Sequence, residues 1–107
     1  MEQTLANGKV LQNAATTGNG VVVDLKGEVR ETTLYIIGSA GVGAGAIQLE
    51  TADDVAYAGT WAAIGSPVTV VASAQLIVQK TGCLRAVRAR ISTTVTGGTV
   101  TCKLYGN

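Results

Sequence analysis

The sequence predicts an all-β protein: a single-domain antiparallel β-sandwich or jelly roll of about eight short strands. Apolar and polar residues alternate in several short segments, turn residues recur about every ten positions, and no segment keeps a helical period. With 107 residues, the chain is long enough for one hydrophobic core and too short for two. Hydrophobic residues make up 47% and charged ones 14%, so most of the chain should fold. Phenylalanine is absent, which predicts a core of aliphatic side chains.

Residues 1–19 are predicted to form an N-terminal arm, and residues 20–107 the sandwich domain. The arm is rich in small polar residues, and its last part, from residue 14 onward, is typical of a connector. One interpretation is a frayed chain end. The other is an arm that becomes ordered against a neighbouring subunit, with Leu5, Val10 and Leu11 as its candidate contact residues. The sequence leaves both interpretations open.

Taken in order, the expected strands are separated by glycine-, aspartate- and serine-containing turns. They cover residues 20–25, 29–38, 47–51, 55–57, 68–72, 75–80, 84–91 and 99–105. Residues 39–46 are expected to form a glycine-rich loop between strands. Gly65-Ser66-Pro67 is predicted to be a turn, with Pro67 at a strand start or edge because proline has no amide hydrogen to donate.

The last two expected strands give the clearest alternation and are predicted to pair as a half-buried antiparallel hairpin across the turn-rich residues 92–98. Side chains of a strand point alternately to opposite faces, so each of these strands has one apolar and one polar face. The apolar set, expected in the core, is Val87, Ala89, Ile91, Val100, Cys102 and Leu104. The polar set is Arg88, Arg90 and Lys103.

Arg88, Arg90 and Lys103 are candidate partner-contact residues, because pairing of the two strands would cluster them on one polar face. The planar guanidinium of arginine pairs with carboxylates through two hydrogen bonds, which favours an acidic partner. The alternative is an ordinary solvated sheet face. The formal net charge is +1, and no aromatic residues are interleaved with the basic ones, so binding of nucleic acid is not expected.

Tyr57, Trp61, Asp53 and Asp54 form a candidate ligand loop. Aromatic side chains on loops commonly stack on sugars, whereas a lone tryptophan in a small β domain is more often a core residue whose indole N–H has a partner. The two aspartates, with Glu50 nearby, could bind calcium, which takes six or more oxygen ligands. A solvated turn is the favoured interpretation because the D-x-D-x-D-G pattern is missing.

The sequence contains no motif for catalysis or cofactor binding. Gly38–Gly45 resembles a phosphate-binding loop, but it lacks the final Gly-Lys-Ser/Thr and leads into a segment that alternates like a strand. Histidine, the commonest general base and metal ligand, is absent. Cys83 and Cys102 are expected to be free, buried thiols. We therefore expect no enzymatic activity, no metal and no cofactor.

Targeting signals are also missing from the sequence. Polar residues follow Met1, without the basic and apolar regions of a secretory signal. The longest uncharged apolar stretch, residues 34–49, contains four glycines and is shorter than the roughly 20 residues that span a bilayer. We expect a protein that is made in a cytosol and has no membrane partner.

Three features occur together in residues 59–107. They are the Trp-bearing turn Gly59-Thr60-Trp61 with Ala63-Ile64-Gly65, the strand LRAVRARI at 84–91, and a Gly-Gly turn into the last strand, TGGTVTCKLY at 96–105, before Gly106-Asn107. In these features the chain resembles the small all-β structural proteins of tailed bacteriophages, such as capsid decoration or cement proteins and related head or tail components.

The resemblance implies a function in the virion. Such a protein would be made in the host bacterial cytoplasm, carry no enzymatic activity, and stabilise the head by binding a capsid or tail protein as a homo-oligomer, with a trimer favoured. The alternative is a carbohydrate- or receptor-binding module of a phage tail or head fibre. The resemblance implies no particular site residues.

Overall fold

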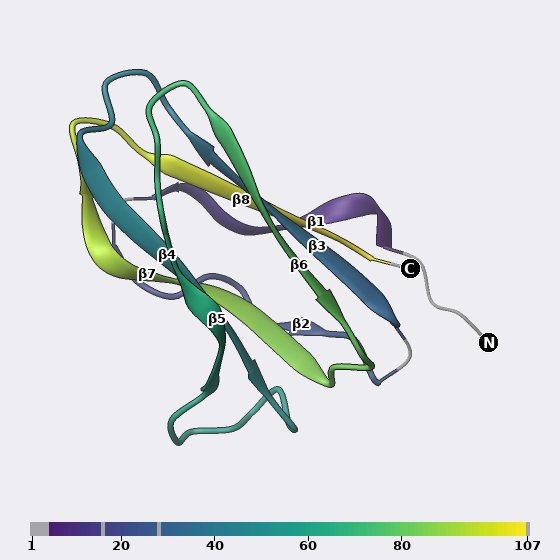
Figure 1. Cartoon of the computed structure of the whole chain (residues 1–107). Coiled ribbons are helices and arrows are strands. Elements are labelled where there is room, and N and C mark those ends of the chain that lie inside the picture. Colours follow the sequence, from purple (N-terminus) through teal and green to yellow (C-terminus); the bar gives the residue numbers. More distant parts are fainter. Residues whose placement is uncertain (1–4, 16, 28, 107) are drawn as a thin grey trace.

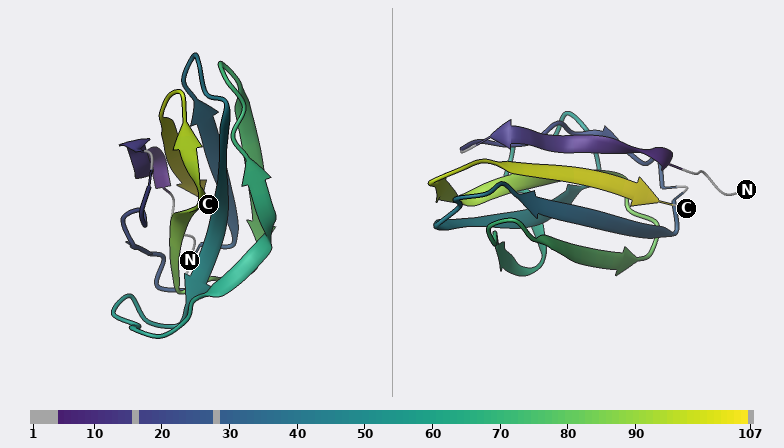
Figure 2. Two further views of the ribbon diagram at one scale, coloured as in Figure 1. Left: turned by 90° about the vertical axis from the view of Figure 1, so that its left-hand side faces the viewer. Right: turned by 90° about the horizontal axis from the view of Figure 1, so that it is seen from above.

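The computed structural model describes residues 5–15, 17–27 and 29–106. These residues form two four-stranded antiparallel sheets that pack face to face (Figures 1 and 2). The strands are β1 (Leu5–Ala15), β2 (Val23–Asp24), β3 (Glu31–Gly38), β4 (Ala44–Ala52), β5 (Ala62–Thr69), β6 (Gln75–Thr81), β7 (Ala86–Thr96) and β8 (Val100–Gly106). None of the described residues forms a helix that could cross a membrane. The prediction of an all-β fold is confirmed.

Strand pairing shows that the chain is folded back on itself like one long hairpin. β4 pairs with β5, β3 with β6, β2 with β7, and β1 with β8. Ladders between β3 and β8 and between β4 and β7 join these pairs into sheet A, of order β1-β8-β3-β6, and sheet B, of order β2-β7-β4-β5. Apart from β4 and β5, successive strands therefore lie in different sheets.

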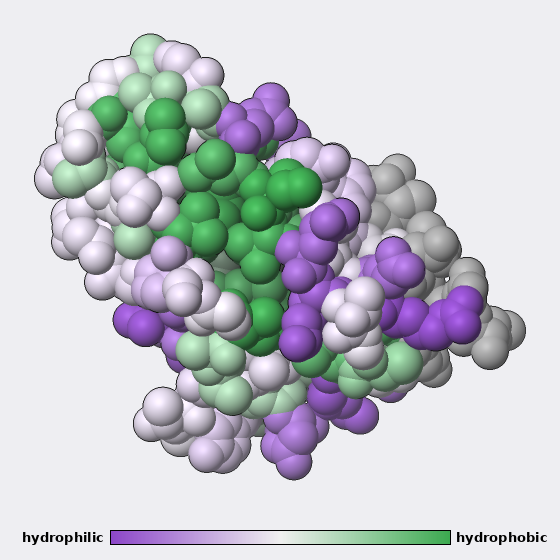
Figure 3. All heavy atoms as spheres, viewed as in Figure 1, coloured by the Kyte–Doolittle hydropathy of each residue, from purple (hydrophilic) through white to green (hydrophobic). Residues whose placement is uncertain are grey.

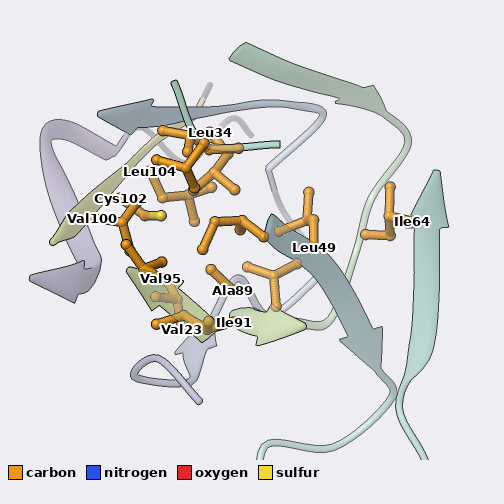
Figure 4. Packing of buried hydrophobic residues seen from close by; sticks show 14 of the residues in the cluster. Val23, Leu34, Leu49, Ile64, Ala89, Ile91, Val95, Val100, Cys102 and Leu104 are labelled. Atoms are coloured by element: carbon orange, nitrogen blue, oxygen red, sulfur yellow. The ribbon is translucent and has the colours of Figure 1, made fainter. Parts of the chain in front are cut away.

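The core lies between the sheets and is aliphatic, as the composition predicts. Leu34, Val100, Cys102 and Leu104 of sheet A point toward Leu49, Ala89, Ile91 and Val95 of sheet B (Figure 4). All six residues of the predicted apolar set are buried. Full burial of one such leucine or valine side chain contributes about 1.5–3 kcal/mol. Alternation in the sequence therefore identified the inward-facing side chains of the last two strands.

The predicted hairpin of the last two strands is wrong. β7 pairs with β2 and β4 in sheet B, whereas β8 pairs with β1 and β3 in sheet A. Residues 97–99 carry the chain across from one sheet to the other. An alternating pattern requires only that one face of a strand meets the core, and it does not specify the neighbouring strand. Here both apolar faces meet the same core from opposite sides.

Residues 5–15, predicted to belong to an arm, form β1 at the edge of sheet A. β3 occupies one side of β8, so the backbone groups on the other side of β8 are free to pair with β1 of the same chain. Leu5, Val10 and Leu11 lie on this strand, but their side chains are outside the described set, as are residues 1–4. Contact between this segment and a neighbouring subunit stays a prediction.

The expected turn at residues 65–67 is a bulge inside β5. Leu49 pairs with Ile64 and Ile47 with Val68, so β5 carries extra residues between these pairs. The buried Gln48 donates hydrogen bonds to the carbonyls of Ile64 and Gly65, both at 3.2 Å, and so satisfies groups that the bulge leaves unpaired. β5 is an edge strand, the kind of position predicted for its proline.

The glycine-rich loop between β3 and β4 packs against the turn between β7 and β8. Gly41 and Gly97 both have positive φ, +92° and +79°, and a Cβ atom on Gly41 would lie 2.8 Å from the carbonyl oxygen of Gly97. Ser39 fixes the contact: its N–H donates to the Thr99 carbonyl at 3.0 Å, and its Oγ accepts from the Thr99 N–H at 2.9 Å. Close backbone approach explains these glycines without any phosphate ligand.

We expect Gly97→Ala to lower the free energy of unfolding by about 2 kcal/mol. Alanine is unfavourable at this positive φ, and its methyl group would also collide with the carbonyl oxygen of Gly41. Gly65→Ala is the matched control, since Gly65 has a similar φ of +68° and open space around its Cβ position. Gly65→Ala should lower the free energy of unfolding by about 1 kcal/mol, from backbone strain alone. Urea denaturation of both variants measures the difference, and equal losses would disprove the collision.

Candidate interaction surface

A carboxylate on the outer face of sheet B neutralises part of the predicted basic set. Glu50 accepts a hydrogen bond from Arg88 Nε at 3.0 Å on Oε1 and one from Arg90 Nε at 2.9 Å on Oε2. The side chain of Glu50 is only 7% exposed, against 19% for Arg88 and 41% for Arg90. Strand register explains the contact, because Glu50 on β4 lies directly opposite Arg88 on β7.

The third predicted basic residue does not belong to this cluster. Lys103 lies on β8, in the other sheet, where it pairs with Tyr35 of β3. The structure therefore brings Arg88 and Arg90 together and places Lys103 on the opposite side of the sandwich. Within the chain, Glu50 is the carboxylate that pairs with the two arginines, and contact with an acidic partner stays a prediction. Glu50 shares the polar parity of its strand, but the sequence does not reveal the register that pairs it with Arg88.

The candidate ligand loop is closed around its tryptophan. Trp61 is 4% exposed, its Nε1–H donates to the Tyr57 carbonyl at 3.1 Å, and the Arg88 guanidinium lies 4.4 Å from the ring centroid. As one interpretation predicts, the indole is buried and its N–H has a partner. Its position under Arg88, however, places it outside sheet B and not between the sheets. A sugar cannot stack on this ring.

The remaining residues of that loop form a turn instead of the expected strand at 55–57. Asp54 accepts hydrogen bonds from the Ala56 N–H at its Oδ1 and from the Tyr57 N–H at its carbonyl, and Asp53 and Asp54 are exposed. Among the described residues, no group of three or more acidic, cysteine or histidine side chains could hold a metal ion. Tyr57 itself is 47% exposed.

The outer face of sheet A, in contrast, carries two tyrosines, two isoleucines, one lysine and four uncharged polar side chains in a regular grid. Three cross-strand rows run over β6, β3 and β8. The rows are Gln79–Thr33–Tyr105, Ile77–Tyr35–Lys103 and Gln75–Ile37–Thr101, and we call these nine residues the tyrosine face.

The tyrosine face is hollowed at its centre. The rings of Tyr35 and Tyr105 meet edge to face, with centroids 5.6 Å apart and planes at 85°. They line a depression of 430 Å³ together with Thr33, Ile37, Gln75 and Lys103. The sequence analysis placed Lys103 on a polar strand face but missed this site, because alternation does not reveal that β3 lies between β8 and β6 and so brings Tyr35 and Gln75 to this face.

A second surface lies along the edge formed by β5 and β6, the outermost strands of the two sheets. Hydrophobic residues gather over this edge (Figure 3). We call the exposed Val71 and the half-buried Val68, Ala72, Leu76 and Val78 the edge patch. β5 carries a bulge and a proline, but β6 pairs with β3 in unbroken register and leaves its other side unpaired in the described part of the chain. Unprotected edges of this kind bind further strands or subunits.

The two cysteines are free, but only one is buried. Cys102 faces the core, whereas Cys83 is exposed in the connection between β6 and β7, where the expected burial is wrong. Desolvation by burial raises the pKa of the Cys102 thiol to about 12. Its thiolate is therefore nearly absent at neutral pH.

We expect one thiol per folded chain to react with a thiolate-selective reagent at pH 8, and both to react in urea, because the thiolate is the nucleophile. The pKa of about 12 keeps Cys102 protonated until the core opens. Absorbance of the released chromophore counts the thiols. Cys83→Ser should abolish labelling of the folded protein; equal labelling rates for both thiols in the folded state would contradict the structure.

Comparison with known proteins finds similarity in structure alone. No protein-family model matches the chain, and no curated protein matches its sequence. The fold is similar to that in the crystal structure of the SPBc2 prophage-derived protein YomS, with a TM-score of 0.72 and 18% sequence identity. The match covers 100% of this chain and 97% of that one. The two chains therefore share one fold over nearly their whole lengths.

Proposed function

We propose that this chain is a non-enzymatic structural protein of a tailed-phage particle, acting as a capsid decoration or cement protein that stabilises the head as a homo-oligomer. The observation that carries this proposal is the likeness in fold to a prophage-derived protein, which extends over the whole chain. The virion is the expected location, and a capsid or tail protein the expected partner. The likeness in sequence features to small phage structural proteins points in the same direction.

The strand order supports a more specific description of the sandwich as a jelly roll. A jelly roll is a double sheet made when a long hairpin of eight strands is rolled up, and it is common in viral capsid and lectin domains. Folding β1 onto β8, β2 onto β7, β3 onto β6 and β4 onto β5 gives such a hairpin. The orders of sheets A and B are those expected after rolling.

We place the contact between copies at the edge patch. The unpaired side of β6 offers backbone hydrogen-bonding groups, and the apolar side chains beside it lose exposure when a second copy covers them. The charged cluster of sheet B is a weaker candidate, because Glu50 already neutralises one of its arginines and the tryptophan beneath is buried. A symmetric oligomer, with the trimer as the expected order, covers the edge of every copy.

Light scattering of the purified chain tests assembly. We expect an oligomer for the wild type at tens of micromolar and a monomer for Val71→Lys, which puts a charge on the most exposed residue of the patch, 47% exposed. Val21→Lys is the matched control, since Val21 is 66% exposed and lies away from this edge, and it should stay oligomeric. A strictly monomeric wild type, or equal masses for both variants, overturns assembly through the edge patch.

Sedimentation with undecorated phage heads tests the decoration function itself. The wild type should co-sediment with matching heads and raise their resistance to heat or low salt. A chain that stays in the supernatant with every head tested is not a decoration protein.

One observation favours the alternative function, a carbohydrate- or receptor-binding module of a tail or head fibre. This observation is the depression on the tyrosine face. The loop around Trp61 does not support the alternative, because its tryptophan is buried.

A further inference from the structure

The residues that line the depression on the tyrosine face are held in place by regular sheet structure. They lie on β3, β6 and β8, which are joined by continuous ladders without a register shift. Side chains that project from paired strands are held more firmly than those of loops. The volume of 430 Å³ falls in the range of roughly 300–1,000 Å³ that small-molecule sites occupy. The site is thus large enough for a small ligand without a change in the fold.

The aromatic side chains of the depression form a corner. With their planes at 85°, the rings of Tyr35 and Tyr105 present surfaces in two directions, and Ile37 adds an apolar floor beside them. The C–H face of a pyranose ring packs on aromatic surfaces of this kind, and phenolic hydroxyls can donate and accept hydrogen bonds.

Uncharged polar groups complete the wall. Gln75 contributes an amide with both donors and an acceptor, and Thr33 contributes a hydroxyl, which accepts a long hydrogen bond of 3.5 Å from the Gln79 amide. Groups of this kind match sugar hydroxyls, which also donate and accept. A purely apolar ligand would leave these groups without partners.

Lys103 gives the depression its charge. Among its described lining residues none is acidic, and no described carboxylate forms an ion pair with Lys103. The contrast with sheet B is direct, since Glu50 there holds both arginines. An ammonium beside aromatic rings and without a counter-charge favours a ligand that brings its own anion.

We infer that the tyrosine face binds an acidic saccharide, whose ring packs in the corner of Tyr35 and Tyr105 and whose carboxylate pairs with Lys103. This inference does not depend on assembly through the edge patch, because all of the described residues that line the depression belong to one chain. It would give a phage-particle protein a means of holding charged glycans.

Microarrays of glucuronic acid-containing oligosaccharides and their carboxyl-reduced counterparts test the inference, followed by calorimetry on the best pair. We expect the wild type to bind an acidic oligosaccharide at least tenfold more tightly than its reduced counterpart. Lys103→Gln should remove this preference, and Tyr105→Ala should weaken binding to both. Tyr105→Phe should keep most of the binding affinity, because the aromatic ring remains.

Tyr57→Ala is the matched control, since it removes an exposed tyrosine from the loop on the other sheet and should leave binding unchanged. Circular dichroism and thermal melting establish that each variant is folded. The inference is overturned if the wild type binds no acidic oligosaccharide at millimolar concentration, or if Tyr57→Ala abolishes binding. It is also overturned if reduced and acidic forms bind equally. The light-scattering result for Val71→Lys is independent of all three outcomes.

Discussion

Replacing Leu104 by alanine is expected to lower the free energy of unfolding by about 3 kcal/mol, the middle of the range for large-to-small core substitutions. Leu104 is fully buried and lies in the centre of sheet A, directly opposite Leu34 of β3. Ladders on both sides of β8 limit how far the backbone can move to fill the cavity. Urea denaturation followed by tryptophan fluorescence measures the loss.

Lys103→Ala supplies the control for this substitution, because it shortens the neighbouring exposed side chain of the same strand. It should change the free energy of unfolding by no more than about 0.5 kcal/mol, as is usual at the surface. If Leu104→Ala also stays within that range, the interior of the sandwich is packed differently from this description.

Glu50→Ala should lower the free energy of unfolding by about 2 kcal/mol. Removing one partner from a buried ion pair costs roughly 3–5 kcal/mol, and partial exposure of the arginines reduces the cost. Two guanidinium groups lose their shared carboxylate, and Arg88 still lies over the buried Trp61. Chemical denaturation at low and high salt measures the loss, which should shrink as salt rises.

A double-mutant cycle separates the contributions of the two arginines. Arg90 is 41% exposed and Arg88 only 19%, so coupling of Glu50 to Arg88 should be the stronger. One cycle compares the wild type with Glu50→Ala, Arg88→Ala and their double variant. The other cycle uses Arg90→Ala in place of Arg88→Ala. A coupling energy near zero in both cycles would mean that the cluster contributes nothing to folding.

Period-two alternation was sufficient to predict an all-β fold and the core residues of the last two strands. Val87, Ala89, Val100 and Leu104 are fully buried, and each was identified by the parity of its strand. Val21 shows the limit of the method: it continues the alternation of Val23 but is 66% exposed, although Asn19 and Val23 on either side of it pair with β7. Parity is a local property of the chain, whereas burial also needs a neighbour.

The surfaces could not be predicted because they depend on which strands are neighbours. Glu50 meets Arg88 only when β4 lies beside β7, and Tyr35 meets Tyr105 only when β3 lies beside β8. Hydrophobic alternation is satisfied equally by several strand orders, so it contains no information about these pairs. The assignment of Arg88, Arg90 and Lys103 to one face failed for this reason.

The folded-back topology has a consequence for synthesis of the chain on the ribosome. β7 and β8 are the last strands to emerge, yet each lies between two earlier strands, β7 between β2 and β4 and β8 between β1 and β3. A nascent chain that ends at β6 holds only the β3–β6 and β4–β5 pairs, with their apolar faces open. Sheet B cannot be completed before β7 has left the exit tunnel, and sheet A cannot be completed before β8 has. Folding of the sandwich must therefore wait for the synthesis of β7 and β8, and pairing of strands so distant in sequence is typically slow.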